Sequence, residues 1–317
     1  MRNVFLSRRT TADISTRVEE VLRSLGNFEP PLCLDRVREV LGLRRGYFHL
    51  PPAEVGRGAG WRPSHPAVSA AHKLDLQAVY LADRRAILIN AAAPAIKQRW
   101  NEAHEIGHAL LDWHYELLLG DDEQTLSPAC HARIEAEAMY AAGRLLFLGD
   151  RLGRTFRDEP PGIRSVLSIA RRFGNGTFTT VWRIVEDADA PMFGMLSVHP
   201  VLGGEYPLHT GPCRYFIRSR SFAERFGGIN ESDVLAAARS YCLSIRQGPL
   251  GGAEVVLHDD GQALNRFVCE TFHNGYDAVT IGTAQESADF VAPAAGGVEQ
   301  FTGRLVEERL PQRPHGR

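Results

Sequence analysis

The run H-E-I-G-H at positions 104–108 constrains this chain more than any other feature. It falls in a stretch after Pro94 that is predicted to be helical, where residues four apart share one face, with about 5–6 Å between Cβ atoms. His104 and His108 therefore point the same way and can hold one tetrahedral zinc ion. Glu105 lies about 100° around the helix, so it is predicted to reach a metal-bound water as a general base rather than to bind the metal. The spacing predicts a centre that hydrolyses peptide bonds.

An ordinary amphipathic helix with two surface histidines is the alternative to this metal site. The helix is apolar on most sides, so its polar cluster would be buried, and unpaired buried polar groups cost several kcal/mol. A bound metal removes that cost. Gly107 costs about 1 kcal/mol relative to Ala inside a helix, and we expect it where another backbone passes close by. The apolar residues are Trp100, Ala103, Ile106, Ala109, Leu110 and Leu111.

A third ligand is needed, and His114 is one candidate because it lies ten residues after His104. That interval works when a glycine three residues after the second histidine turns the chain out of the helix. Leu111 occupies this position, so nothing is expected to break the helix there. His114 is therefore predicted to be a half-exposed histidine near the helix end that faces elsewhere.

A carboxylate from the next helix, predicted over residues 132–148, is the better candidate. The face that follows Glu135 carries small and then apolar residues, namely Ala138, Met139, Ala142, Leu145 and Leu146. This face suits close packing against the helix that carries Gly107, so we predict Glu135 as the third ligand and keep Glu137 as the second choice. Two histidines and a carboxylate accept zinc, but also manganese or iron.

Five widely spaced cysteines, with no C-x-x-C pair, indicate reduced thiols in a cytosolic protein rather than a disulfide framework. Cys130 lies in the predicted loop just before the Glu135 helix, where a thiolate could reach the zinc and block the water position. The alternative, which we favour, is a free thiol near a helix start.

Residues 86–90 and 98–111, the second reading QRWNEAHEIGHALL, resemble the ImmA/IrrE family of metallopeptidases, whose strand is followed by an R-[FW]-x-x-A-H-E-[IL]-G-H-x-[LI]-L helix. Residues 135–146, EAEAMYAAGRLL, resemble the family helix E-x-x-A-N-x-F-A-x-x-L-L. In that pattern the leading glutamate, here Glu135, is the third zinc ligand. The resemblance covers about residues 10 to 190, with Met139 where Asn or Asp is usual and Leu148 where Pro is usual.

The resemblance implies a gluzincin-like zinc endopeptidase that cleaves a helix-turn-helix transcriptional repressor. Cleavage in this family derepresses stress-response, phage-defence or mobile-element genes. Several members carry a C-terminal sensor domain of GAF-like fold, and single-stranded DNA is a candidate activator. The alternative is a non-catalytic DNA-binding or regulatory protein with a structural metal. Glu105 argues against it, because a structural zinc site has a closed ligand set and needs no neighbouring base.

The chain is expected to have an α+β fold in four parts. A mostly helical, zincin-like peptidase domain with a small sheet spans 10–150, and a helix-turn-helix-like segment spans 151–188. A separate, GAF-like α+β domain spans 191–290, and a loose tail spans 291–317. Within these parts we expect helices at 11–25, 34–41 and 231–246, a linker at 149–162, and strands at 78–81, 86–89, 193–198, 214–217, 254–258, 267–272 and 278–281.

Two segments could bind nucleic acid. Helices expected at 165–174 and 177–184 resemble a helix-turn-helix, but the second offers only Thr179, Thr180 and Arg183 to a groove, so we favour a structural helix pair. A basic-aromatic stretch provides an effector-binding candidate for single-stranded DNA, and its alternative is a strand with core aromatics and solvated arginines. It contains Arg214, Arg218, Arg220 and Arg225 with Tyr215, Phe216, Phe222 and Phe226.

Composition limits the remaining classes. With 317 residues, 44% of them apolar, the chain can bury a real core, and its net charge of -2 gives no global basic field for nucleic acid. We find no signal peptide, and no apolar run approaches the roughly 18–20 residues that span a bilayer. A cytoplasmic protein with no membrane partner is expected.

Overall fold

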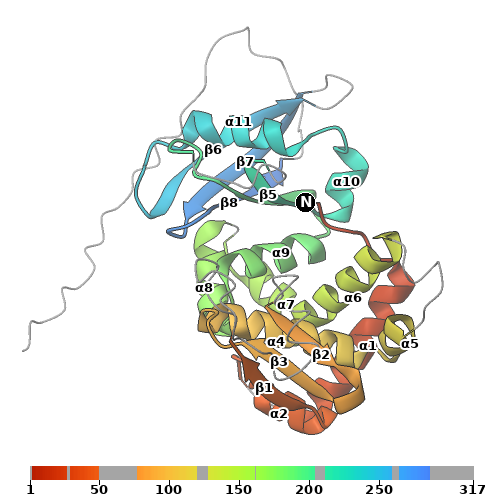
Figure 1. The fold of residues 1–317 in the computed structure, drawn as a ribbon. Helices are drawn as coiled ribbons and strands as arrows, with labels where there is room; N and C mark the ends of the chain where they lie inside the picture. Colours follow the sequence, from red (N-terminus) through yellow and green to blue (C-terminus); the bar gives the residue numbers. More distant parts are fainter. Residues whose placement is uncertain are drawn as a thin grey trace, which may run out of the picture.

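The computed structural model describes residues 2–26, 29–49, 77–119, 128–160, 162–203, 211–258 and 264–285. They form an α+β fold with two sheets. A helical part holds the small sheet on its outer side, and a second part with a larger sheet lies over it (Figure 1). None of the described helices is long and apolar enough to cross a membrane.

The small sheet has the order β1-β3-β2, with β1 parallel and β2 antiparallel to β3. The two strands expected around the turn at 83–84 are confirmed, and β1 is an addition to them. Helix α2 has the expected bounds. The elements up to this sheet are α1 (Arg8–Leu25), α2 (Leu34–Leu41), β1 (Arg44–Phe48), β2 (Ala78–Leu81), a 3-10 turn η1 (Ala82–Arg84) and β3 (Ala86–Asn90).

Helix α1 begins where the Ser7 hydroxyl accepts the backbone N–H of Thr10, which satisfies one of the free donors of the first turn. Its apolar residues recur at helical spacing and are buried: Ile14, Val18, Val21 and Leu25. This face enters the same core as Ala141 and Leu145 on the neighbouring helix α6 (Pro128–Leu146).

Helix α4 (Ala95–Leu110) packs closely against α6. A Cβ added to Gly107 would lie only 2.6 Å from the carbonyl oxygen of Ala138, so the glycine permits the two backbones to approach. This confirms the reason expected for a glycine at position 107. Ala138 and Ala142 are fully buried, as expected for the small face of α6.

The helix does break before His114, contrary to expectation. Leu111 has an extended backbone and caps α4, and a separate helix α5 (Asp112–Leu119) begins after it. No glycine or proline marks this break. Leu111 is fully buried, so its packing in the core accompanies the change of direction.

The prediction of a linker at 149–162 is wrong for most of that range, since Arg151–Asp158 form helix α7. Only Leu152 is buried on this helix, so the sequence offers almost no apolar repeat to recognise. Helices α8 (Ile163–Phe173) and α9 (Thr177–Asp187) follow as expected, joined through Gly174 in the left-handed conformation, with φ 66°.

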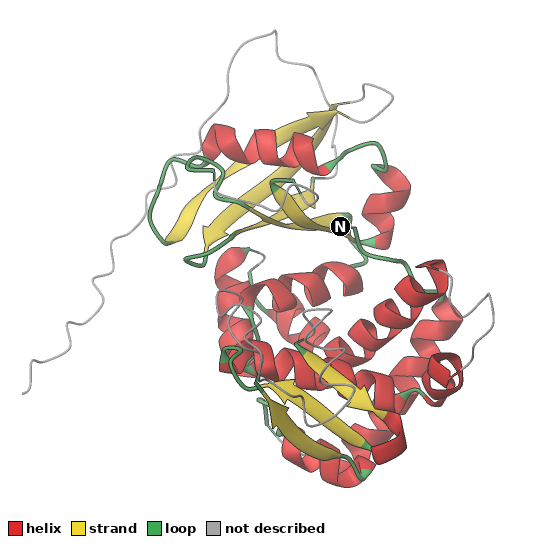
Figure 2. Ribbon diagram, viewed as in Figure 1, coloured by secondary structure: helices red, strands yellow, loops and turns green. Residues whose placement is uncertain are grey.

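Helix α9 is not available to a DNA groove. It contacts the larger sheet on one side and α6 on the other, and Thr180 and Arg183, two of its three candidate base-reading residues, are buried. Figure 2 shows α9 running between the two parts of the molecule. The contacts favour the structural helix pair over a DNA reader.

The larger sheet is antiparallel, with the order β5-β4-β8-β7-β6. Strands occur at every expected run, with β6 and β7 longer than predicted. Helix α11 stops at Tyr241 rather than 246, and α10 was not expected. The elements are β4 (Met192–Ser197), β5 (Cys213–Arg218), α10 (Arg220–Arg225), α11 (Glu231–Tyr241), β6 (Gly248–His258), β7 (Leu264–His273) and β8 (Ala278–Ala284).

The two faces of this sheet belong to different cores. One face joins α10 and α11 in a core of its own, which includes Phe193, Met195 and Phe216. The other face joins the core of the helical part through Met192, Leu196, Ile217, Val279 and Ile281. The described residues between 191 and 285 therefore share a core with the helical part as well as having one of their own. The GAF-like assignment stays a prediction.

Candidate metal centre

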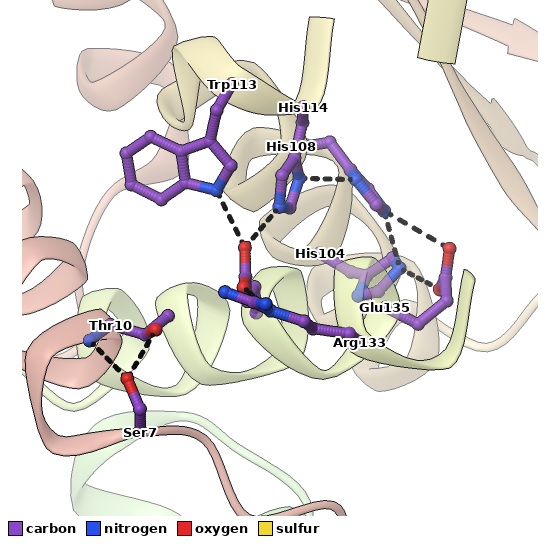
Figure 3. Close-up of polar contacts among 9 residues, drawn as sticks. Ser7, Thr10, His104, His108, Trp113, His114, Arg133 and Glu135 are labelled. Carbon is purple, nitrogen blue, oxygen red and sulfur yellow. Dashed lines mark hydrogen bonds and ion pairs between the residues drawn. The ribbon is translucent and has the colours of Figure 1, made fainter. Parts of the chain in front are cut away.

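Three side chains from two helices converge at the surface between α4 and α6. His104 Nε2 lies 3.1 Å from one carboxylate oxygen of Glu135 and 3.3 Å from His108 Nε2. His108 Nε2 lies 3.6 Å from the other Glu135 oxygen. Figure 3 shows both imidazoles turned toward the glutamate. Among the described residues, these three form the group of possible metal ligands, and their donor atoms all lie within 4.8 Å of one another.

The spacing of these atoms fits a metal ion. Zinc–nitrogen and zinc–oxygen distances of about 2.0–2.2 Å in a tetrahedron separate neighbouring donors by about 3.3–3.6 Å. The three separations between these donor atoms, 3.1, 3.3 and 3.6 Å, are close to that range. Two imidazole nitrogens pointing at one another also need either a shared proton or a cation between them, since two lone pairs repel.

The protonation states of His108 and Glu135 suit a cation. Burial lowers the pKa of His108 to about 3, helped by the charge of His104. Burial alone would raise the pKa of Glu135, but its hydrogen bond to His104 and the neighbouring histidine charges lower it to about 2. A neutral imidazole and an ionised carboxylate are the forms that bind metal.

Glu105 lies beside this group and is buried. Burial, with the charge of Glu135, raises the pKa of its carboxyl group to about 7, against the opposing effects of the His104 charge and the backbone hydrogen bond from Tyr80. A carboxyl group with a pKa near neutrality can both accept and return a proton, which is what a general base needs.

His114 lies in a layer behind the ligand group, not in it. It is fully buried rather than half-exposed, and its Nδ1 lies 3.1 Å from Nδ1 of His108. The helix break at Leu111 brings it there. The expectation that it faces elsewhere is therefore corrected: it faces the back of a candidate ligand.

Glu137, the second choice for third ligand, also lies in the layer behind. One of its oxygens accepts hydrogen bonds from Trp113 Nε1 at 2.7 Å and faces His114 Nε2 at 3.1 Å. The other accepts from Arg133 Nε at 2.8 Å. Burial would raise the pKa of Glu137, but these donors lower it to about 2.

Comparison with known families bears on this geometry, because residues 64–184 match the family model for the IrrE N-terminal-like domain, Peptidase_M78. This stretch of the chain is similar to the IrrE N-terminal-like domain. The matched region contains both histidines and both glutamates of the candidate centre, and it supports the resemblance to ImmA/IrrE peptidases.

A solved structure, a Mycobacterium tuberculosis transcriptional regulator, resembles most of this chain in fold. The TM-score is 0.51 at 15% identity, over 86% of this chain and 76% of that one. The likeness in fold therefore extends well beyond residues 64–184. No curated protein matches the sequence.

His131 is a neighbour of the centre that the sequence reasoning missed. It is exposed and lies one turn before Glu135 on α6, and its charge acts on both His108 and Glu135. The spacing of four residues from Glu135 is the signal that could have identified it.

Cys130 lies in the first turn of α6, which begins at Pro128, and not in the loop before it. Its sulfur is not part of the donor group within the described chain. The role in latency stays a prediction that these contacts do not support.

The arginines of the candidate effector site contact the protein itself. Arg214 forms an ion pair with Asp277 at 3.5 Å. The guanidinium groups of Arg218 and Arg220 lie 5.7 and 5.5 Å from the ring of Phe5, in the N-terminal segment that runs beside β5.

The aromatic residues of the same stretch are largely in the core. Phe216 and Phe222 are fully buried, and Tyr215 packs against Phe178 and Trp182 of α9. Stacking of bases needs exposed rings. The single-stranded DNA activator therefore stays a prediction without support from this surface.

Proposed function

We propose that this chain is a zinc-dependent endopeptidase that cleaves a helix-turn-helix transcriptional repressor. The observation that carries the proposal is the convergence of His104, His108 and Glu135 beside the buried carboxyl group of Glu105. A structural metal site has a closed set of ligands and needs no general base such as Glu105 beside it.

The chemistry divides between the metal and the protein. When bound, zinc supplies a Lewis acid and lowers the pKa of a water molecule to about 7. Glu105 takes a proton from the attacking water at its carboxylate and passes it to the leaving amine. The Tyr80 backbone N–H holds this carboxylate in place.

An extended peptide can reach Glu105 along β2. This strand pairs with β3 on one side, and within the described residues no strand pairs with its other edge. An exposed edge accepts a peptide by backbone hydrogen bonds. Because Tyr80 belongs to β2 and contacts Glu105, a segment bound at that edge would have its carbonyl groups near the base.

The repressor as substrate is supported by the family resemblance and by the transcriptional regulator of similar fold. The protein would act in the cytoplasm, where such repressors are found. Manganese or iron in place of zinc is compatible with the same donors.

The test is coexpression with any helix-turn-helix repressor that is encoded beside the gene. We expect repressor cleavage with the wild type and none with Glu105→Gln, which keeps the shape of the side chain but cannot take a proton. Glu105→Gln should retain zinc, measured by atomic absorption. Equal cleavage by both proteins, or no cleavage by either, would reject the proposed reaction.

A further inference from the structure

The candidate ligand His108 is joined to a line of buried side chains that crosses three helices. Its Nδ1 lies 3.1 Å from Nδ1 of His114 on α5, and His114 Nε2 lies 3.1 Å from Glu137 on α6. All three are at least nine-tenths buried, with exposed fractions of 8%, 0% and 3%. Figure 3 shows His114 between His108 and the neighbours of Glu137.

With a neutral imidazole at His114, the carboxylate of Glu137 sets the direction of the hydrogen bonds in this line. An ionised carboxylate only accepts, so His114 must donate to Glu137 from Nε2. A neutral imidazole that carries its proton on Nε2 offers a lone pair at Nδ1. His108 must then donate from its own Nδ1 to His114, which leaves the lone pair of His108 on Nε2. That nitrogen is the one turned toward His104 and Glu135.

Glu137 is itself held as an acceptor by geometry. Trp113 and Arg133 donate to its two oxygens. An indole N–H and a guanidinium have no acceptor to offer, so neither can reverse the direction of the line.

His104 has no such support. Its Nδ1 is buried without a hydrogen-bond partner among the described residues. Metal-bound histidines normally donate their second ring N–H to an acceptor, which sets both the tautomer and the ring orientation. The two candidate ligands on α4 are therefore unequal: within the part of the chain that the structure describes, His108 has a ring neighbour that can accept its second proton and His104 has none.

We propose that His114 and Glu137 are positioning residues that hold His108 in the Nδ1–H tautomer, with Nε2 directed at the metal. This inference rests on the proposed metal site. It makes His108 the preorganised anchor of the site and His104 the ligand that metal binding must order. Loss of the line weakens zinc binding, although neither residue touches the metal.

A purely structural role would have a different signature. His114 and Glu137 could merely join α5 to α6, and their loss would then lower stability without changing the His108 ring. Zinc affinity and the tautomer of His108 therefore separate the two roles, where activity alone would not.

The test compares wild type, His114→Phe and Glu137→Gln. His114→Phe keeps a ring in the buried space but removes the acceptor of His108. Zinc dissociation constants are measured on metal-free protein by competition with a chromophoric chelator, and thermal melts of the same samples report folding. Asp112→Asn is the matched control, since Asp112 lies exposed on α5 two residues before His114 and outside the line.

We expect zinc to bind about 10- to 100-fold more weakly to His114→Phe, with a smaller loss for Glu137→Gln and none for the control. Long-range ¹H–¹⁵N spectra of the metal-free protein should show His108 protonated at Nδ1 in the wild type. In His114→Phe the signal should shift toward the Nε2–H form.

Two results are distinguishable. If the wild type binds no zinc, the proposed function fails, and the tautomer spectra still decide the positioning role. If His114→Phe and Glu137→Gln bind zinc as tightly as the wild type and His108 keeps its tautomer, the positioning role is overturned. Should His114→Phe fail to fold, Glu137→Gln carries both measurements.

Discussion

Two glutamates separated by one residue on α6 have different surroundings. Successive helical residues are rotated by about 100°, so Glu135 and Glu137 point about 200° apart. Glu135 faces the paired histidines, with its side chain 39% exposed, whereas Glu137 is buried behind them. Glu135 is therefore the more exposed member of this pair, and His131 lies one helical turn before it on the same side of α6.

Glu135→Ala removes the one oxygen ligand proposed for the metal. We expect the purified variant to lose stoichiometric zinc on dialysis, because two histidines alone leave the cation without a balancing charge. Metal content by atomic absorption measures this. Retention of one zinc per chain would show that another carboxylate serves, and the ligand assignment would be wrong.

His131→Asn should separate catalysis from metal binding. The side chain is exposed and near the centre, where it can meet the substrate, so we expect a lower kcat/KM for repressor cleavage with unchanged zinc content. Steady-state cleavage of the purified repressor measures it. Unaltered kcat/KM would make His131 a bystander at the surface.

At the level of the elements, the contact between α4 and α6 sets the distance between the ligands. Gly107 allows the approach, and the backbone of Ala138 fills the space where a side chain would be. The contact between Gly107 and Ala138 thus lies within one helical turn of the two histidines on α4 and of Glu135 on α6, and it holds the three candidate ligands together.

Gly107→Ala should destabilise the protein although alanine favours helix. The gain in helix propensity is about 1 kcal/mol, but a Cβ 2.6 Å from a backbone carbonyl forces the helices apart, at a cost of about 1–3 kcal/mol or more. We expect a lower urea midpoint and weaker zinc binding.

Gly153→Ala is the matched control. On α7 the added Cβ would meet Arg157 at 3.6 Å, an ordinary contact with a flexible side chain. The urea midpoint should rise by the equivalent of about 0.5–1 kcal/mol. If both variants behave alike, the contact at Ala138 does not limit the packing of α4 on α6.

Sequence patterns predicted the elements that have clear periodicity or clear ends. Helix α2, strands β2 and β3, and the pairing of the H-E-I-G-H helix with the Glu135 helix followed from such signals. The break at Leu111 did not, because no residue there has a backbone preference for ending a helix and tertiary packing decides it. Since the position of His114 depends on that break, the line from His108 to Glu137 could not be predicted.

On the scale of the whole molecule, α9 and the N-terminal segment join the helical part to the larger sheet. Arg183 on α9 is buried, forms ion pairs with Glu186 and Asp187, and lies 4.3 Å from the ring of Tyr140 on α6. On the opposite side, a Cβ at Gly194 of β4 would lie 2.5 Å from Val181, so sheet and helix are in close contact. Helix α9 thus contacts both the helix that carries Glu135 and the sheet.

Asn3→Ala should loosen the N-terminal segment from β5. The Asn3 amide donates to the Arg218 carbonyl oxygen and accepts its N–H, both at 3.0 Å. Removing it leaves two backbone groups unpaired, at a cost of about 1–3 kcal/mol each if they stay buried. Hydrogen exchange at the Arg218 amide should accelerate, while Arg9→Ala, at an exposed position, should leave it unchanged. Unaltered exchange in both variants would show that the segment does not protect the strand.

The shared core of the larger sheet also decides how the C-terminal part can be studied. Met192, Leu196, Ile217, Val279 and Ile281 pack with the side chains of the helical part. A shortened protein that ends near position 190 would expose the partners of these residues as one hydrophobic surface, which favours aggregation. The behaviour of such a truncated protein would therefore reflect its solubility. Regulation by the C-terminal part is better probed in the full-length protein, with single substitutions on the face of the larger sheet that packs against α11.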